Sequence, residues 1–211
     1  MSSWASVLDQ LAALDPAEFD PDSLSDEQVR EVIPRTQLAI NRLSALMTRA
    51  VAAGEARQVH TGDGMVSMKT WLTGHCRVSG REAVGLVRAG RRLRQLPELA
   101  AAYAEGAVTR AHVDAVTTAV TPARVAKAAE AGIDLAETDE ILADAARALL
   151  PEETAQAVRR WVHGIDPTVT STTTPACVVS SGWPARPAAA STPPATSTPW
   201  APRPCTPHWK R

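Results

Sequence analysis

The sequence is poor in aromatic residues and in cysteine, and it has no long apolar run. Phe, Tyr and Trp make up 4% of its 211 residues, and the hydrophobic fraction of 45% rests largely on alanine, with 32 alanines in the first 167 residues. Alanine is the best helix former and is depleted from strands, which argues against an all-β fold. The length is sufficient for a domain with a substantial core.

Further absences narrow the class of protein. The chain has no apolar stretch of 18 residues and no secretory signal at its start, so we expect a cytoplasmic protein without a membrane span. Cys76, Cys177 and Cys205 are too few and too scattered for a disulfide framework, which fits a reducing compartment. The GxGxxG, P-loop, GxSxG and HExxH motifs are missing, so the sequence indicates no catalysis, no cofactor and no small-molecule ligand.

The composition changes sharply near residue 167. Residues 1–167 contain all 23 acidic residues and 18 of the 22 basic ones, whereas residues 168–211 contain nine of the 16 prolines and 14 Ser or Thr. Such a Pro-rich segment cannot build a core, and we expect it to be disordered. The sequence therefore predicts a short helix and turn-rich linker over 1–24, a helical domain over 25–167 and a tail over 168–211.

The tail has a second unusual property, because three of the six tryptophans lie in it (Trp183, Trp200 and Trp209). Disordered linkers are normally poor in aromatic residues. Threonine codons begin with AC, and a one-base shift turns them into aspartate codons wherever the preceding base is G. Residues 168–174 then read Asp-Gly-Asp-Leu-Asp-Asp-Asp, which restores the missing acids. We therefore expect the tail to be encoded out of frame with the helical domain, and the chain to be truncated.

Helix start and stop signals recur along residues 1–167. Ser25 and Gln28 form a capping box, and apolar residues at helical spacing follow as far as Gly54, with Pro34 expected to kink or restart the helix. A polar loop is expected from Gly54 to Gly64. Later helices are expected to begin at or just after the following residues: Ser67, Ser79, Pro97, Thr109, Thr121, Thr138 and Pro151. The predicted fold is all-α, a single domain of eight or nine helices.

Residues 67–96 have the layout of a helix-turn-helix. A short helix with Trp71 precedes the turn around Gly74 and Val78, and a capped helix starts at Ser79. Five arginines fall within about 100° of one another on a helical projection, opposite Leu86 and Leu93. Arginine pairs with phosphate and, bidentately, with guanine. The candidate nucleic-acid-binding residues are Arg77, Arg81, Arg88, Arg91 and Arg92.

Other interpretations remain open at this point. An amphipathic helix needs a polar face, so the arginines also fit a solvated surface on a protein-interaction or homo-oligomeric module. We expect Arg81, Arg88 and Arg92 to form one exposed stripe, with Leu86 and Leu93 buried. Trp71 is expected to be a core anchor, with roughly 3–5 kcal/mol lost on truncation to alanine.

Metal binding is not indicated. His60, His75 and Cys76, and separately Cys205 and His208, have ligand chemistry, but neither set reaches the four ligands at regular spacing of a zinc site.

A family resemblance covers roughly residues 25–165. The chain resembles the actinobacterial 13E12-repeat family, also called domain of unknown function 222, in the order and spacing of the following residues: Gly64, Ser67, Trp71, Leu72, Ser79, Glu82, Ala83, Ala89, Leu93, Leu96, Pro97, Gly106, Val108, Thr109, His112 and Val113.

The resemblance implies a DNA-associated helical region of the kind that precedes an HNH endonuclease module, often in proteins linked to mobile elements. An HNH module needs a metal-binding, water-activating histidine on a ββα unit. No residue of this sequence matches that motif, so the resemblance implies DNA as the partner and no nuclease activity in this chain.

Overall fold

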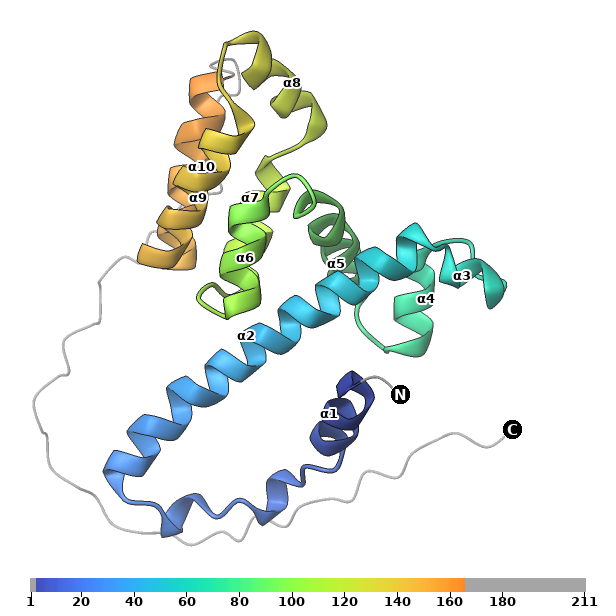
Figure 1. The fold of residues 1–211 in the computed structure, drawn as a ribbon, viewed down its shortest axis with the longest axis vertical. Coiled ribbons are helices and arrows are strands. Elements are labelled where there is room, and N and C mark those ends of the chain that lie inside the picture. The colour runs from blue at the N-terminus through green and yellow to red at the C-terminus, as the bar shows by residue number, and fades with distance from the viewer. Residues whose placement is uncertain (1–2, 166–211) are drawn as a thin grey trace, which may run out of the picture. The chain divides into compact units, whose positions relative to one another are not determined.

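Helices account for most of the chain that the computed structural model describes, residues 3–165, and no β-strand occurs among them (Figure 1). These residues belong to one compact unit. Residues 3–165 form ten α-helices, which are α1 Ser3–Ala12, α2 Asp26–Ala56, α3 Val59–Gly62, α4 Met68–His75, α5 Gly80–Arg92, α6 Pro97–Glu105, α7 Arg110–Ala119, α8 Pro122–Glu130, α9 Leu135–Ala148 and α10 Pro151–Ile165. The all-α prediction is confirmed; the predicted disorder and frame shift of 168–211 lie outside the described residues.

The helix starts follow from local capping. Ser25 Oγ accepts a hydrogen bond from the Gln28 amide (3.3 Å), and Gln28 Oε1 accepts one from the Ser25 amide (2.8 Å). This capping box begins α2 where the sequence places it. Leu96 precedes α6, which begins with Pro97 and ends at Gly106 in the left-handed conformation.

Three expectations about helix boundaries are wrong. Of the two outcomes expected at Pro34, the restart is wrong, because α2 continues for 31 residues through the proline. One proline removes a single backbone hydrogen bond, and the remaining bonds of a long helix outweigh that loss. The predicted loop after Gly54 contains the short helix α3, which raises the number of helices above nine. Thr138 lies inside α9, because the side chain of Asp134 accepts from the Ala136 amide and caps the helix earlier.

Buried side chains gather in two clusters. The larger joins α6, α7, α9 and α10 around Leu99, Tyr103, Val113, Val116 and Leu142. The smaller lies between α2, α4 and α5 and contains Val51, Met68, Leu72, Ala83 and Leu86. The C-terminal half of α2 contacts both clusters, so this helix connects α4 and α5 to the rest of the domain.

Two glycines allow close packing against α2. A Cβ atom on Gly90 of α5 would lie 3.0 Å from Ala52 Cβ and 3.2 Å from the Thr48 carbonyl oxygen. A Cβ atom on Gly106, whose φ is +83°, would lie 2.7 Å from Leu38 Cδ1. The Gly106 carbonyl also accepts a hydrogen bond from Asn41 Nδ2 (2.9 Å). Both positions therefore favour glycine for a reason of tertiary packing.

Replacing Gly106 by alanine is expected to destabilise the domain by about 2 kcal/mol, because the left-handed conformation costs roughly 1–2 kcal/mol and the new methyl group displaces Leu38. Gly132→Ala is the matched control, since Gly132 has φ +76° with open space around its Cβ position. Urea unfolding of both variants measures the difference. Equal losses would show that the contact with α2 contributes nothing.

None of the helices between residues 3 and 165 combines the length and apolar character needed to cross a bilayer.

Candidate nucleic-acid interface

Helices α4 and α5 are consecutive and pack on each other and on α2. Ser67 Oγ accepts from the Thr70 amide (3.2 Å) at the start of α4. Ser79 Oγ accepts from the Glu82 amide (3.1 Å) at the start of α5. Leu72 and Ala83 are both fully buried, which fixes the two helices against each other and leaves one face of α5 at the surface.

The five candidate arginines differ in their surroundings. Arg77 is exposed in the turn between the helices, with φ at +54°, and Arg81 is exposed in the first turn of α5. Arg88 and Arg92 are half-buried, and Arg91 is exposed. Within the part of the chain that the structure describes, no ion pair joins Arg77, Arg81 or Arg92 to an acidic side chain.

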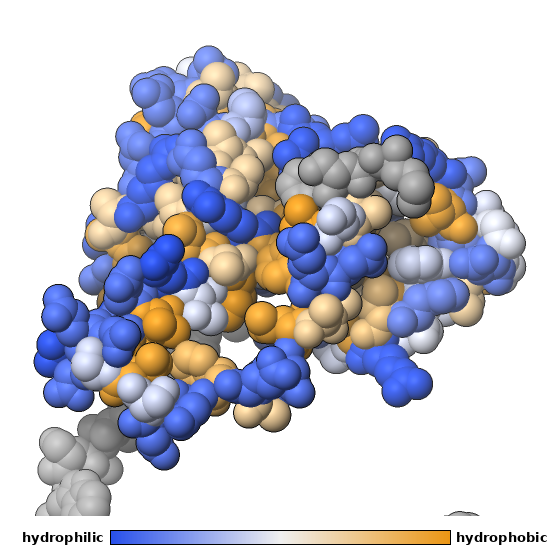
Figure 2. Space-filling model, turned by 60° about the horizontal axis from the view of Figure 1, so that its bottom comes forward, coloured by the Kyte–Doolittle hydropathy of each residue, from blue (hydrophilic) through white to orange (hydrophobic). Residues whose placement is uncertain are grey.

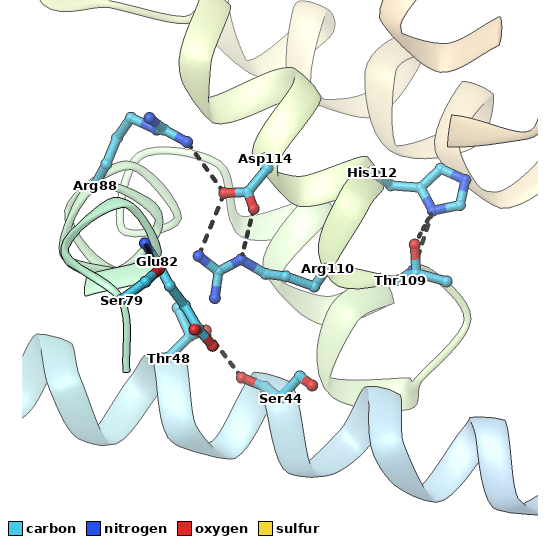
Figure 3. Close-up of polar contacts among 9 residues, drawn as sticks. All are labelled: Ser44, Thr48, Ser79, Glu82, Arg88, Thr109, Arg110, His112 and Asp114. Carbon is cyan, nitrogen blue, oxygen red and sulfur yellow. Dashed lines mark hydrogen bonds and ion pairs between the residues drawn. The ribbon is translucent and has the colours of Figure 1, made fainter. Parts of the chain in front are cut away.

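Arg88 is held by an acid from another helix. Its Nη2 donates to Asp114 Oδ1 of α7 (3.1 Å), and the same carboxylate accepts from Arg110 Nε at Oδ2 (3.1 Å) and from Arg110 Nη2 at Oδ1 (3.3 Å). Figure 3 shows the two guanidinium groups on either side of Asp114. Two positive charges share one negative charge, so this trio retains an excess of one positive charge.

Arg91 is also paired. Its Nε donates to Glu55 Oε2 (2.9 Å), and its Nη2 donates to the other carboxylate oxygen, which ties α5 to the end of α2. Hydrogen bonding to Glu55 raises the pKa of Arg91. The predicted exposed stripe of Arg81, Arg88 and Arg92 is therefore wrong at Arg88 and Arg92, which are half-buried, and Arg88 is also paired with Asp114. Leu86 is buried as expected, whereas Leu93 is only partly buried against the larger cluster.

Sequence reasoning missed two further cations. Lys69 of α4 and Arg110 of α7 line a surface hollow together with Arg81 and Arg88. The exposed Val84 lines the same hollow, with 43% of its surface accessible. In the sequence, Arg110 and Asp114 are one helical turn apart, which is the spacing of an ordinary ion pair on a helix surface. Arg110 reaches this face only because α7 packs on α5.

We call this face the α5 cationic surface and define it as Lys69, Arg77, Arg81, Arg88, Arg92 and Arg110. The acids beside it are Glu82 and Asp114, so its side chains sum to an excess of positive charge. Residues 1–167 as a whole contain more acids than bases. A local cationic face on an acidic domain can attract an anionic partner.

The aromatic and histidine side chains near the turn are engaged with each other. Trp71 Nε1 donates to Asp63 Oδ2 (2.6 Å), and the Trp71 and His75 rings stack with centroids 4.5 Å apart. Trp71 is only partly buried against the smaller cluster, so it packs at the edge of the core. Among residues 3–165, no group of three or more His, Cys, Asp or Glu side chains could hold a metal ion. Cys205 and His208 lie outside the described residues.

His112 belongs to the pattern of the family resemblance, and its position is structural. It is 6% exposed. Its Nδ1 accepts from the Thr109 amide (3.1 Å), so Nε2 carries the proton and donates to the Leu149 carbonyl (3.0 Å). The Thr109 side chain lies against the same ring nitrogen in Figure 3. His112 therefore joins α7 to the segment between α9 and α10.

Comparison with known proteins finds no protein-family model, no curated protein and no solved structure that matches this chain. The described residues define the class as an all-α helical protein.

Proposed function

We propose that the helical domain binds DNA through the α5 cationic surface, as the DNA-associated region of a protein resembling the 13E12-repeat family. The observation that carries the proposal is the convergence of cations from α4, α5 and α7 around one exposed helix face. Phosphate contacts from Lys and Arg provide most of the affinity in non-specific DNA binding. The proposal is for binding alone, because no residue of the sequence matches a nuclease motif.

The contacts suggest different roles for the cations. Arg77 lies in the turn between α4 and α5, and Arg81 lies in the first turn of α5. Both side chains are exposed and unpaired, so they can reach phosphates. Arg88 is oriented by Asp114, so its guanidinium group has less freedom to lose on binding. Val84, exposed between them, offers an apolar contact of the type that thymine methyl groups accept. This arrangement supports α5 as the helix that approaches a groove.

The test is the salt dependence of duplex DNA binding. In the double variant Arg81→Ala/Arg92→Ala, the slope of log K against log salt is expected to fall by about 1.8, since each lost phosphate contact removes about 0.9. Affinity measured by fluorescence anisotropy between 50 and 200 mM salt gives the slope.

The matched control is Arg159→Ala/Arg160→Ala, which removes the same charge from two exposed positions on α10. An equal drop in both double variants would mean that general charge, and not the α5 cationic surface, attracts DNA. Absence of binding by the unmodified chain at 50 mM salt would overturn the proposal.

A further inference from the structure

Helix α2 crosses α5 and α6 (Figure 1), and a groove lies between the three helices. Small and apolar side chains provide most of its lining, among them Ala45, Ala52, Leu93, Pro97, Ala101 and Ala104. Its volume of about 560 Å³ exceeds that of any single side chain, so the groove can receive several side chains from one helix face. On the face drawn in Figure 2, apolar patches lie among hydrophilic side chains, so the helices leave apolar surface uncovered.

The groove carries positive charge. Arg49 of α2 and Arg94, which follows α5, line it and are exposed, and no acidic residue lines it. Arg42 lies two helical turns before Arg49 on the same side of α2, and its Nε donates to the Glu105 carbonyl at the end of α6 (3.0 Å). Within residues 3–165, none of these three guanidinium groups pairs with a carboxylate. The positive charge of the groove therefore continues along α2 toward its start.

The N-terminal segment of the chain has the opposite charge. Residues 1–24 contain five acids and no Lys, Arg or His. The first acid lies in α1 and the other four in the linker between α1 and α2: Asp9, Asp15, Glu18, Asp20 and Asp22. This segment is therefore electrostatically complementary to the groove and to the arginines that extend it.

Helix α1 has an apolar side that nothing covers. Val7 is 39% exposed, Leu8 49% and Leu11 41%, and these three residues point to one side of the helix. Every side chain from Ala5 to Ala12 is exposed. An isolated helix of this length is marginally stable in water. Helix α1 therefore requires a surface that covers its apolar side.

The linker is long enough to bring α1 to the groove. Residues 13–25 include two short 3₁₀ turns. At about 3.3 Å per extended residue and about 2 Å per residue in the turns, they span up to about 35 Å. On α2 the groove begins at Ala45, about 29 Å along the helix from Asp26. Helix α1 is about 15 Å long, and the groove covers residues 45–53 of α2, which extend over about 12 Å. An α1 helix that runs antiparallel to α2 therefore matches the groove in position and length.

Other combinations of surface and occupant fit less well. Ile33, Ile40 and Leu43 are also exposed on α2, but on average they lie roughly 150° around the helix from Arg42 and Arg49. An acidic linker beside them would lie away from those arginines. A helix from another chain would lack the linker, which holds α1 near the groove at an effective concentration on the order of millimolar.

We propose that residues 1–24 form an intramolecular strap on this groove. The acids of the linker lie along Arg42 and Arg49, and α1 docks antiparallel to α2 with its apolar side in the groove. The docked strap covers the apolar side of α1 and gives acidic partners to arginines that have none in the rest of the domain. The strap does not depend on DNA binding, because the groove and the α5 cationic surface share no residue.

The first experiment measures disulfide formation in the full chain after its three cysteines are replaced by serine. Leu8→Cys/Ala101→Cys places one thiol on α1 and the other on the α6 wall of the groove, both at exposed positions. This pair is expected to form an intramolecular disulfide at least about tenfold faster than Leu8→Cys/Ile40→Cys, because docking raises the effective concentration of one thiol at the other.

Two outcomes of the cross-linking would overturn the proposal. A rate in the Ile40→Cys pair that equals or exceeds the rate in the Ala101→Cys pair would mean that α1 does not select the groove. A disulfide that joins two chains, and so doubles the mass, would mean that α1 of a second copy fills the groove.

The second experiment follows hydrogen exchange of the α1 amides. A docked α1 protects its amides, whereas an undocked helix of this length exchanges nearly as fast as unfolded chain. Arg49→Glu/Arg94→Glu reverses two charges at the groove and is expected to speed exchange in α1 at least about tenfold. Arg159→Glu/Arg160→Glu is the matched control, because it reverses the same charge at exposed positions on α10 and is expected to leave α1 protected.

The exchange rates decide the proposal independently of the disulfides. Unprotected α1 amides in the unmodified chain would contradict docking, and equal rates in the two double variants would contradict the role of the groove arginines. Unchanged circular dichroism of both variants confirms that a change in exchange is not a loss of folding.

Discussion

Replacing Asp139 by alanine is expected to destabilise the helical domain by about 3 kcal/mol, because this side chain caps a helix other than its own. Asp139 lies in α9 and is 1% exposed. Its carboxylate accepts hydrogen bonds from the amides of Glu98 (2.7 Å) and Leu99 (3.2 Å), in the first turn of α6. Leu96, which precedes α6, provides no side-chain cap, so the alanine variant leaves both amides without this acceptor.

Chemical denaturation of Asp139→Ala and Asp144→Ala provides the measurement and its control. Asp144 lies on the same helix, is exposed and pairs with Arg147 at the surface (3.2 Å), so its removal is expected to cost less than about 1 kcal/mol. Similar losses in the two variants would contradict the capping role of Asp139.

The same carboxylate makes the stability of the folded domain depend on pH, and the sign of this dependence follows from the pKa of Asp139. Burial raises the pKa of Asp139 above its ordinary value, and the two amide donors oppose this effect only in part. Between the ordinary pKa of about 4 and the raised one, the folded state binds more protons than the unfolded state. The contribution of Asp139 to stability is therefore full below the ordinary pKa and decreases as pH rises through the raised pKa. Asp139→Asn is expected to remove this decrease, which denaturation between pH 4 and pH 7 measures.

Leu72→Ala is expected to cost about 3 kcal/mol, and more than Trp71→Ala. Leu72 is fully buried in the smaller cluster beside Met68 and Leu86. Trp71 is partly buried and donates to the exposed Asp63, so we expect its truncation to cost about 2 kcal/mol, less than the sequence alone predicts. Thermal unfolding of the two variants checks the order. A larger loss of stability in Trp71→Ala than in Leu72→Ala would show that the tryptophan is the main core residue of α4.

The sequence of α4 favours the larger side chain, Trp71, as the core residue, because a sequence shows the size and apolar character of a side chain but not its burial. Trp71 and Leu72 are adjacent, so they point about 100° apart on the helix. The contact with α2 and α5 selects Leu72 for the core. The difference is one of tertiary packing, and no local pattern encodes it.

The sequence by itself determined the helical class and most helix starts, because capping depends on residues within about three positions. Ser25, Ser67, Ser79 and Thr121 cap the helices that the sequence assigns to them. The prediction failed at Pro34, where no new helix starts, and in the polar segment after Gly54, where the short helix α3 forms. In both cases the energy of the surrounding helix or its contacts outweighed the local signal.

The tertiary structure alone decided which charges remain free. Periodicity places five arginines near one another, yet it cannot show that Asp114 lies beside Arg88 or that Glu55 lies beside Arg91, since these partners are 26 and 36 positions away in the chain. It equally cannot show that Lys69 and Arg110 join the α5 cationic surface, or that the domain holds α2 by the side that carries Asn41. Helical periodicity fixes the direction of each side chain on its own helix, whereas the ion pairs and free faces depend on how the helices pack.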